Sequence, residues 1–140
     1  MQSMFIEDLA VAQSAHLVRT VRDADLVSFA ALTGDENPVH LDEDYASRTP
    51  FGRRIAHGML SAGFISAVIG TRLPGPGAIY VAQTLRFRRP VHIGDSVSTR
   101  VQIVDIDAAR GRVRLETVCS VDGITVLDGE AEVMVPRRQR

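Results

Sequence analysis

The sequence feature that most constrains this fold is one uncharged helix followed by a long β-rich half. Residues Gly58–Thr71 carry no charged side chain and are apolar or small on nearly every face, which is typical of a buried helix. Leu73–Gly77 ends this helix with two prolines and two glycines. From Ile79 to about Val135 the hydrophobic period changes to two, and short connections imply antiparallel strands. We therefore expect an α+β domain whose curved sheet wraps a central helix about 21 Å long.

Several shorter elements are predicted on either side of this central helix. Leu17–Val21 can form a strand, and Asp23 can cap a helix that Gly34 ends. Glu36–Leu41 is predicted to be a polar loop, and Asp42 can cap a short helix through Ala46. In the second half, Ile79–Phe87 alternates as one strand. Asp122-Gly123 predicts a hairpin turn between two later strands.

Composition indicates one domain over residues 1–140 and restricts its environment. The net charge of -1 gives no indication of binding to nucleic acid or to an anionic membrane. The apolar stretch Met59–Ile69 is too short to span a bilayer, and no secretory signal is visible in Met1–Ala10. The lone Cys119 fits a buried structural thiol in a reducing compartment, so we expect a cytoplasmic protein. Residues 136–140 look like a basic tail.

The segment that carries candidate chemistry lies between Gly34 and His40. Asp35 and His40 are five residues apart, so they would diverge on a helix or on a strand and can converge only across a bend. Gly34 and Pro38 supply such a bend, and Asn37 can bond to local backbone and hold its shape. A carboxylate beside an imidazole can transfer protons. Spacing alone also fits a turn-capping aspartate and a solvated histidine, and it offers no third ligand for a metal.

A second candidate feature is His57-Gly58, where the apolar helix begins. The first N–H groups of a helix lack partners, and glycine lets another group approach that backbone closely, which suits a thioester oxygen becoming an enolate. A glycine kept there for packing and a structural His57 are the plain alternatives. Ser66 lies two turns later on nearly the same face, where bonding to its own backbone is the default.

These residues together resemble the signature of the MaoC-like, R-specific enoyl-CoA hydratases. The resemblance extends from about Leu17 to Val135 and is carried by Phe29, Leu32-Thr33-Gly34-Asp35, Asn37-Pro38-Val39-His40, Ala46, Arg54-Ile55-Ala56-His57-Gly58-Met59, Leu73-Pro74-Gly75, Gly77, Ile79-Tyr80, Val91 and Ile93-Gly94-Asp95.

The resemblance implies a hot-dog fold, an antiparallel sheet wrapped around a long central helix and paired into a homodimer. It implies Asp35 and His40 as the catalytic pair and the Gly58 N–H as the oxyanion donor. The remaining substrate-binding residues would be Asn37, His57 and Ser66. Water would add across a trans-2-enoyl thioester, with both members of the pair holding it, and no metal or cofactor is expected. Coenzyme A, or the pantetheine arm of acyl carrier protein, would be part of the substrate.

Three other functions compete with this interpretation. A dehydratase acting on 3-hydroxyacyl groups of acyl carrier protein would run the same chemistry in reverse, and the motif cannot separate the two. A hot-dog thioesterase would need a carboxylate on the central helix, and Gly58–Thr71 contains none. A noncatalytic acyl-binding or structural subunit would be favoured if Asp35 or His40 were missing, and both are present.

Overall fold

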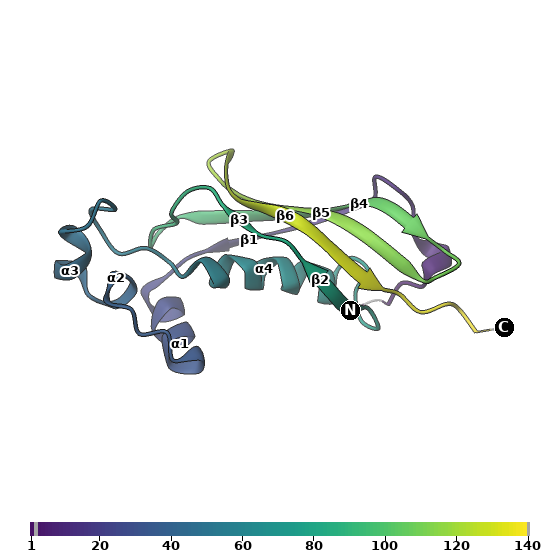
Figure 1. Cartoon of the computed structure of the whole chain (residues 1–140), viewed down its shortest axis with the longest axis horizontal. Coiled ribbons are helices and arrows are strands. Elements are labelled where there is room, and N and C mark those ends of the chain that lie inside the picture. The colour runs from purple at the N-terminus through teal and green to yellow at the C-terminus, as the bar shows by residue number, and fades with distance from the viewer. Residues whose placement is uncertain (2, 140) are drawn as a thin grey trace.

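The computed structural model describes Met1 and residues 3–139 and consists of one sheet, one long helix beneath it and a group of short helices at one end (Figure 1). The helical elements are η1 (Ile6–Asp8), α1 (Asp23–Thr33), α2 (Pro38–Leu41), α3 (Glu43–Ser47) and α4 (Gly58–Thr71). The strands are β1 (Ser14–Thr20), β2 (Ile79–Gln83), β3 (Arg86–Phe87), β4 (Ser96–Asp107), β5 (Arg112–Val121) and β6 (Ile124–Met134).

The sheet is antiparallel and follows the order β1-β4-β5-β6-β2, with β3 also paired to β6. The expected hairpin joins β5 to β6, and its turn residues Asp122 and Gly123 have φ of 50° and 77°. Positive φ at both central positions matches the twist of the flanking strands, which is why Asp-Gly is favoured there. The N-terminal strand begins three residues before the expected Leu17 and ends at Thr20, and the next residue, Val21, is fully buried.

The core lies between the sheet and one side of α4. Ile65, Val68 and Ile69 are buried on the helix, and the inward residues of the central strands, such as Val101 and Leu115, are buried within the same core. The predicted bounds of this helix are confirmed, as is the antiparallel sheet packed on it. The expectation of burial on nearly every face is wrong for a single chain. The side of α4 that faces away from the sheet is exposed at Met59, Gly63, Ser66 and Gly70.

The predicted buried thiol is also found. Cys119 is fully buried on β5, and burial raises the pKa of its thiol. A thiol that is both inaccessible and protonated is a poor nucleophile, which fits a structural role. No helix in the described residues is long and apolar enough to cross a membrane.

The expected strand Ile79–Phe87 is interrupted and forms two strands. The pairing of β2 with β6 shifts register between Tyr80 and Ala82, and the strand stops at Gln83 before β3 begins at Arg86. The interruption brings the carbonyl of Thr84 directly over Gly129 of β6. A Cβ atom added to Gly129 would lie 1.8 Å from the Thr84 carbonyl oxygen. Alternation of side chains cannot reveal such a crossing, because it leaves the hydrophobic period almost unchanged.

The short helices α1, α2 and α3 gather at one end of the sheet (Figure 1). The N-cap of α1 is Arg22, not the predicted Asp23, and the Arg22 N–H donates to the Asp25 carboxylate at 2.8 Å. As predicted, Gly34 ends α1 with a φ of 81°, and Asp42 caps α3 by accepting from the Tyr45 N–H at 3.0 Å.

The predicted loop Glu36–Leu41 is partly wrong, because Pro38–Leu41 forms the single turn α2. Proline fits the first turn of a helix, where its missing N–H costs nothing. The side chain of Asn37 supplies the cap by accepting from the Val39 N–H at 3.1 Å.

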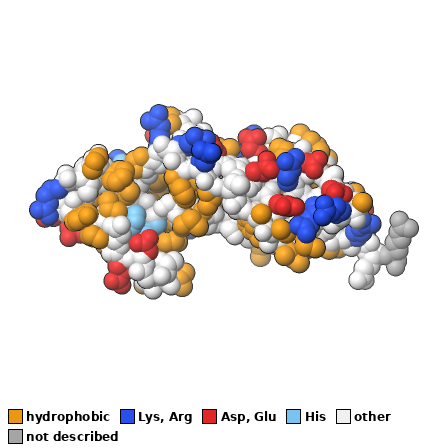
Figure 2. Space-filling view, in the orientation of Figure 1, with side chains coloured by type: hydrophobic (Ala, Val, Ile, Leu, Met, Phe, Trp, Pro, Cys, Tyr) orange, Lys and Arg blue, Asp and Glu red, His pale blue; other side chains and the backbone are white. Residues whose placement is uncertain are grey.

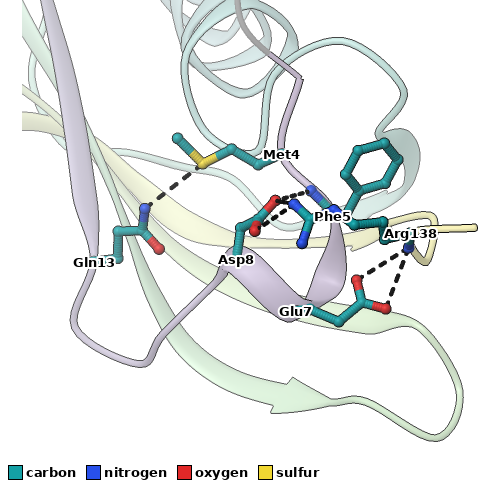
Figure 3. A network of polar contacts seen from close by, with 6 residues as sticks. All are labelled: Met4, Phe5, Glu7, Asp8, Gln13 and Arg138. Carbon is teal, nitrogen blue, oxygen red and sulfur yellow. Dashed lines mark hydrogen bonds and ion pairs between the residues drawn. The ribbon is translucent and has the colours of Figure 1, made fainter. Parts of the chain in front are cut away.

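The expected tail is attached to the N-terminal segment. Arg138 pairs with the Asp8 carboxylate at 2.7 Å, lies 5.1 Å from the centre of the Phe5 ring, and donates its backbone N–H to Glu7 (Figure 3). The Ile6 N–H also donates to the Pro136 carbonyl at 2.9 Å. These residues are therefore part of the fold through Arg138, and Arg140 lies outside the described residues.

Candidate active site

Asp35 is held where α1 turns into α2. The left-handed Gly34 reverses the chain, and the hydroxyl of Thr33 accepts the Asp35 N–H at 3.2 Å. The Asp35 carboxylate in turn accepts the Asn37 N–H at 3.3 Å. The side chain remains exposed, so one carboxylate oxygen is fixed by local backbone while the group stays accessible to water or substrate.

His40 lies on α2 and is buried, with 8% of its surface exposed. Its Nδ1 lies 2.7 Å from the carbonyl oxygen of Ile55, and a carbonyl only accepts, so Nδ1 carries the proton. In the neutral ring, Nε2 is then the nitrogen that can take up a proton. Arg54 supports the same turn, because its Nε–H donates to the His40 carbonyl at 2.7 Å while its guanidinium pairs with Asp23 at 2.7 Å.

His57, the residue before α4, contacts both members of this pair. Its Nε2 lies 3.0 Å from the backbone oxygen of Asp35, and its ring stacks on that of His40 with centroids 3.8 Å apart. Phe29 of α1 covers it with a centroid distance of 4.6 Å. The ring is almost fully buried, and Nδ1 has no hydrogen-bond partner among the described residues. Burial lowers the pKa of His57, and the neighbouring His40 adds to this effect.

A cavity of about 580 Å³ brings these groups together with the start of α4. Asp35, His40, His57 and Gly58 all line it. Its other walls are largely apolar and include Phe51, Ile55, Met59, Phe87, Pro90, Val91, Val126 and Leu127, with Arg88 and Arg89. In Figure 2, pale-blue histidine atoms lie at the surface next to orange hydrophobic and red acidic side chains. A largely apolar wall with a few polar groups is the expected character of a small-molecule site.

The start of α4 can receive a negatively charged oxygen. His57 is the N-cap, and its side chain makes no capping hydrogen bond. The first helix N–H groups therefore have no side-chain acceptor from the cap, and they carry the partial positive charge of the helix terminus. A carbonyl oxygen in the cavity beside Gly58 would meet these donors.

The structure also supplies the third potential metal ligand that spacing did not predict. One ligand atom each from Asp35, His40 and His57 lie within 4.8 Å of one another. The two histidine rings are stacked, with planes only 28° from parallel and centroids 3.8 Å apart, so their in-plane lone pairs cannot meet at one ion held at about 2.1 Å. Nδ1 of His40 and Nε2 of His57 are also engaged with carbonyl oxygens. This geometry suits proton transfer better than metal binding.

The remaining predicted site residues lie elsewhere. Asn37 caps α2 and shapes the turn, as its sequence position indicated, but it does not line the cavity. Ser66 lies on the exposed side of α4, outside the cavity of a single chain, whereas Ser61 is buried and lines it. Ser61 was not predicted from the sequence, although it follows Gly58 by three residues, which places both on one helix face. The Phe87 wall was also missed, because no local pattern links β3 to the start of α4.

Comparison with known proteins identifies the family of this chain. Residues 10–123 match the MaoC like domain. A 3-hydroxybutyryl-CoA dehydratase of Methylorubrum extorquens is 53% identical over 97% of this chain and 87% of its own length. An (R)-specific enoyl-CoA hydratase of Rhodospirillum rubrum is 54% identical over 96% of this chain and 93% of its own length. The unliganded R-hydratase PhaJ1 of Pseudomonas aeruginosa superposes with a TM-score of 0.92, at 47% identity over 97% of this chain and 88% of that one.

The chain therefore belongs to the MaoC-like family, and its architecture is the hot-dog fold that the sequence resemblance implied.

Proposed function

We propose that this protein is an R-specific enoyl-CoA hydratase, which adds water to trans-2-enoyl-CoA to give (R)-3-hydroxyacyl-CoA and also catalyses the reverse dehydration. The observation that carries this proposal is the meeting of Asp35, His40 and the start of α4 in one largely apolar cavity. The names of the R. rubrum hydratase and the M. extorquens dehydratase, which describe the two directions of one reaction, support it.

In the proposed mechanism the thioester carbonyl lies against the N–H of Gly58. Asp35 and His40 hold one water molecule, and Asp35 removes its proton as the oxygen attacks the β carbon. The electron pair of the double bond moves onto the carbonyl oxygen, where the helix N–H groups stabilise the enolate. The proton taken up by Asp35 passes to the free Nε2 of His40, which then delivers it to the α carbon, so both side chains return to their starting protonation states. Because the two side chains act as a coupled pair, their protons are shared across the cycle.

This chemistry needs no metal or other cofactor, and coenzyme A is part of the substrate. The largely apolar walls, including Phe87, suit an acyl chain, and Arg89 provides positive charge at the same cavity for a phosphorylated carrier. The neighbouring Arg88 is paired with the Asp128 carboxylate at 3.1 Å. The proposed compartment is the cytoplasm, which the single buried thiol Cys119 supports.

The proposal includes a homodimer formed through β2 and the open side of α4. β2 is an edge strand, and Ile79, Tyr80 and Val81 on it are exposed. An exposed apolar edge strand is a template for pairing, and a two-fold dimer closes it. The exposed side of α4 carries Ser66, so a substrate contact at that serine would require a second chain against this side.

The test is a hydration assay with crotonyl-CoA and longer trans-2-enoyl-CoA substrates, following loss of the conjugated thioester absorbance. Stereochemistry is read by coupling the product to dehydrogenases specific for (R)- or (S)-3-hydroxyacyl-CoA. The same substrates on acyl carrier protein form the second arm. Turnover on enoyl-CoA with (R) product supports the proposal, whereas activity confined to acyl carrier protein substrates, or an (S) product, contradicts it.

A further inference from the structure

His57 combines three features that a merely space-filling residue does not need. It bonds to the backbone of Asp35, it stacks on the ring of His40, and it buries a polar atom, Nδ1, without a partner among the described residues. Leaving a buried polar atom unpaired costs free energy, so its presence calls for a compensating role. His57 lines the cavity and contacts both proposed catalytic residues through its side chain.

The bond to Asp35 determines the protonation state of His57. A backbone carbonyl only accepts, so Nε2 must carry the hydrogen and the neutral ring has its lone pair on Nδ1. Protonating Nδ1 would create a buried N–H⁺ with no acceptor, beside a second imidazole that also needs to gain a proton during turnover. The groups facing this ring are the backbone carbonyl of Asp35, His40 on α2 and the uncharged Phe29 on α1, and the Asp35 carboxylate is the nearby negative charge.

We propose that His57 is a positioning residue that acts as a neutral imidazole, fixing Asp35 through its Nε2–H and the plane of His40 through ring stacking. The inference rests on the proposed function, because it concerns the geometry of the pair that handles the water. The bond links residues 22 positions apart in sequence, so it ties the turn after α1 to the start of α4. The start of α4, where the Gly58 N–H would bind the substrate oxygen, therefore also fixes the position of the proposed base, Asp35.

Two variants separate the two contacts. His57→Phe keeps an aromatic ring for stacking on His40 but removes the donor to Asp35, and His57→Gln keeps an amide donor but removes the ring. His92→Phe is the control, since His92 also bonds through a ring nitrogen to a backbone carbonyl, at 3.1 Å from Arg54, and does not line the cavity. A displacement of about 1 Å in a catalytic group costs about 10²-fold in rate.

We expect His57→Phe to lower kcat for crotonyl-CoA about 10²-fold with little change in KM, and His57→Gln to recover part of this loss. Melting temperatures identify losses due to unfolding. If His57→Phe and His92→Phe lose stability alike and both keep near-wild-type kcat in the folded fraction, His57 is only structural and the proposal is overturned.

Imidazole ¹⁵N spectra provide a readout that does not depend on activity. The neutral Nε2–H form of His57 should persist as pH falls below the ordinary histidine value of 6.5, because burial lowers the pKa of this ring. A His57 ring that titrates at or above 6.5, or that carries its proton on Nδ1, overturns the proposal. If no enoyl thioester is hydrated by the wild-type protein, the proposed function fails, while these spectra still test the positioning contacts.

Discussion

The ring of Phe87 lies so close to Gly58 that a Cβ atom on that glycine would be 2.6 Å from Cε1 of the ring. A side chain at position 58 therefore has two possible effects: it displaces Phe87, and it blocks a substrate oxygen from the helix N–H groups. Phe87 is 55% exposed, so its ring can move aside at little cost.

A double-mutant cycle separates these effects. We expect Gly58→Ala to lower kcat by roughly 10²–10³-fold, as loss of an oxyanion donor does. The same factor should appear when Gly58→Ala is added to Phe87→Ala, where the clash is gone. The helix itself is not weakened, because alanine is a better helix former than glycine. If Phe87→Ala and the double variant hydrate crotonyl-CoA equally fast, Gly58 is required only for packing.

The proposed catalytic pair gives the most direct prediction. Asp35→Asn keeps the shape of the side chain but removes the base, and His40→Ala removes the proton carrier. Each should reduce turnover of crotonyl-CoA by roughly 10²–10⁴-fold. Glu36→Gln is a suitable control, since it removes a neighbouring carboxylate that does not line the cavity. Near-wild-type rates in both folded active-site variants would leave the proposed mechanism without its acid and base.

Assembly can be tested at the edge strand β2. We expect sedimentation equilibrium to give a homodimer of about twice the 15.3 kDa chain mass. Val81→Lys places a charge on β2 and should shift the protein towards monomer, because lysine on an edge opposes pairing. Val18→Lys is the matched control, an exposed valine on β1 at the other edge of the sheet. A wild-type monomer with full hydratase activity would show that the second copy is not needed.

The contact between Arg138 and Asp8 should depend on pH in a defined direction. The backbone N–H of Phe5, followed by Arg138, holds the pKa of the Asp8 carboxyl below its ordinary value of 3.8. A lowered folded-state pKa stabilises the protein above the unfolded-state value, and this contribution is lost as the pH falls through the folded-state value.

The melting temperature of Arg138→Ala should accordingly be lower than that of the wild type at neutral pH. The difference should shrink below about pH 4 and in high salt. Arg137→Ala is the control, because the Arg137 guanidinium donates to the carbonyls of Ala108 and Ala109, which do not titrate. Its effect should therefore stay the same across this pH range. A constant difference between Arg138→Ala and wild type would mean that the Arg138 guanidinium acts by packing on Phe5 rather than by its charge.

The parts of this structure that sequence predicted are those fixed by local chemistry. The bounds of α4 follow from an uncharged run that ends in a proline- and glycine-rich turn, and the β5–β6 hairpin follows from Asp122-Gly123. Asp35 and His40 were predicted to lie across a bend because no regular element lets them converge. Asn37 could be recognised as a local cap for the same reason.

The unpredicted parts depend on contacts between distant segments. The contact of His57 with Asp35 spans 22 residues, and no periodic pattern reports which turn a buried histidine will meet. The break between β2 and β3 depends on where Thr84 crosses β6. The exposed side of α4 was not predicted, because the composition of an apolar or small helix face does not show what covers it. The same residues can be buried by the rest of the chain or by a second copy.

Gly129 sets a limit on how this enzyme scaffold can be redesigned. With a Cβ there only 1.8 Å from the Thr84 oxygen, any other amino acid would push the β2–β3 connection off β6. That connection leads directly into Phe87 and Arg88 at the cavity wall. A library that randomises the wall to change the accepted acyl group should hold position 129 as glycine. Diversity is better placed at Phe87, Val126 and Leu127, whose side chains define the space without fixing the strand crossing.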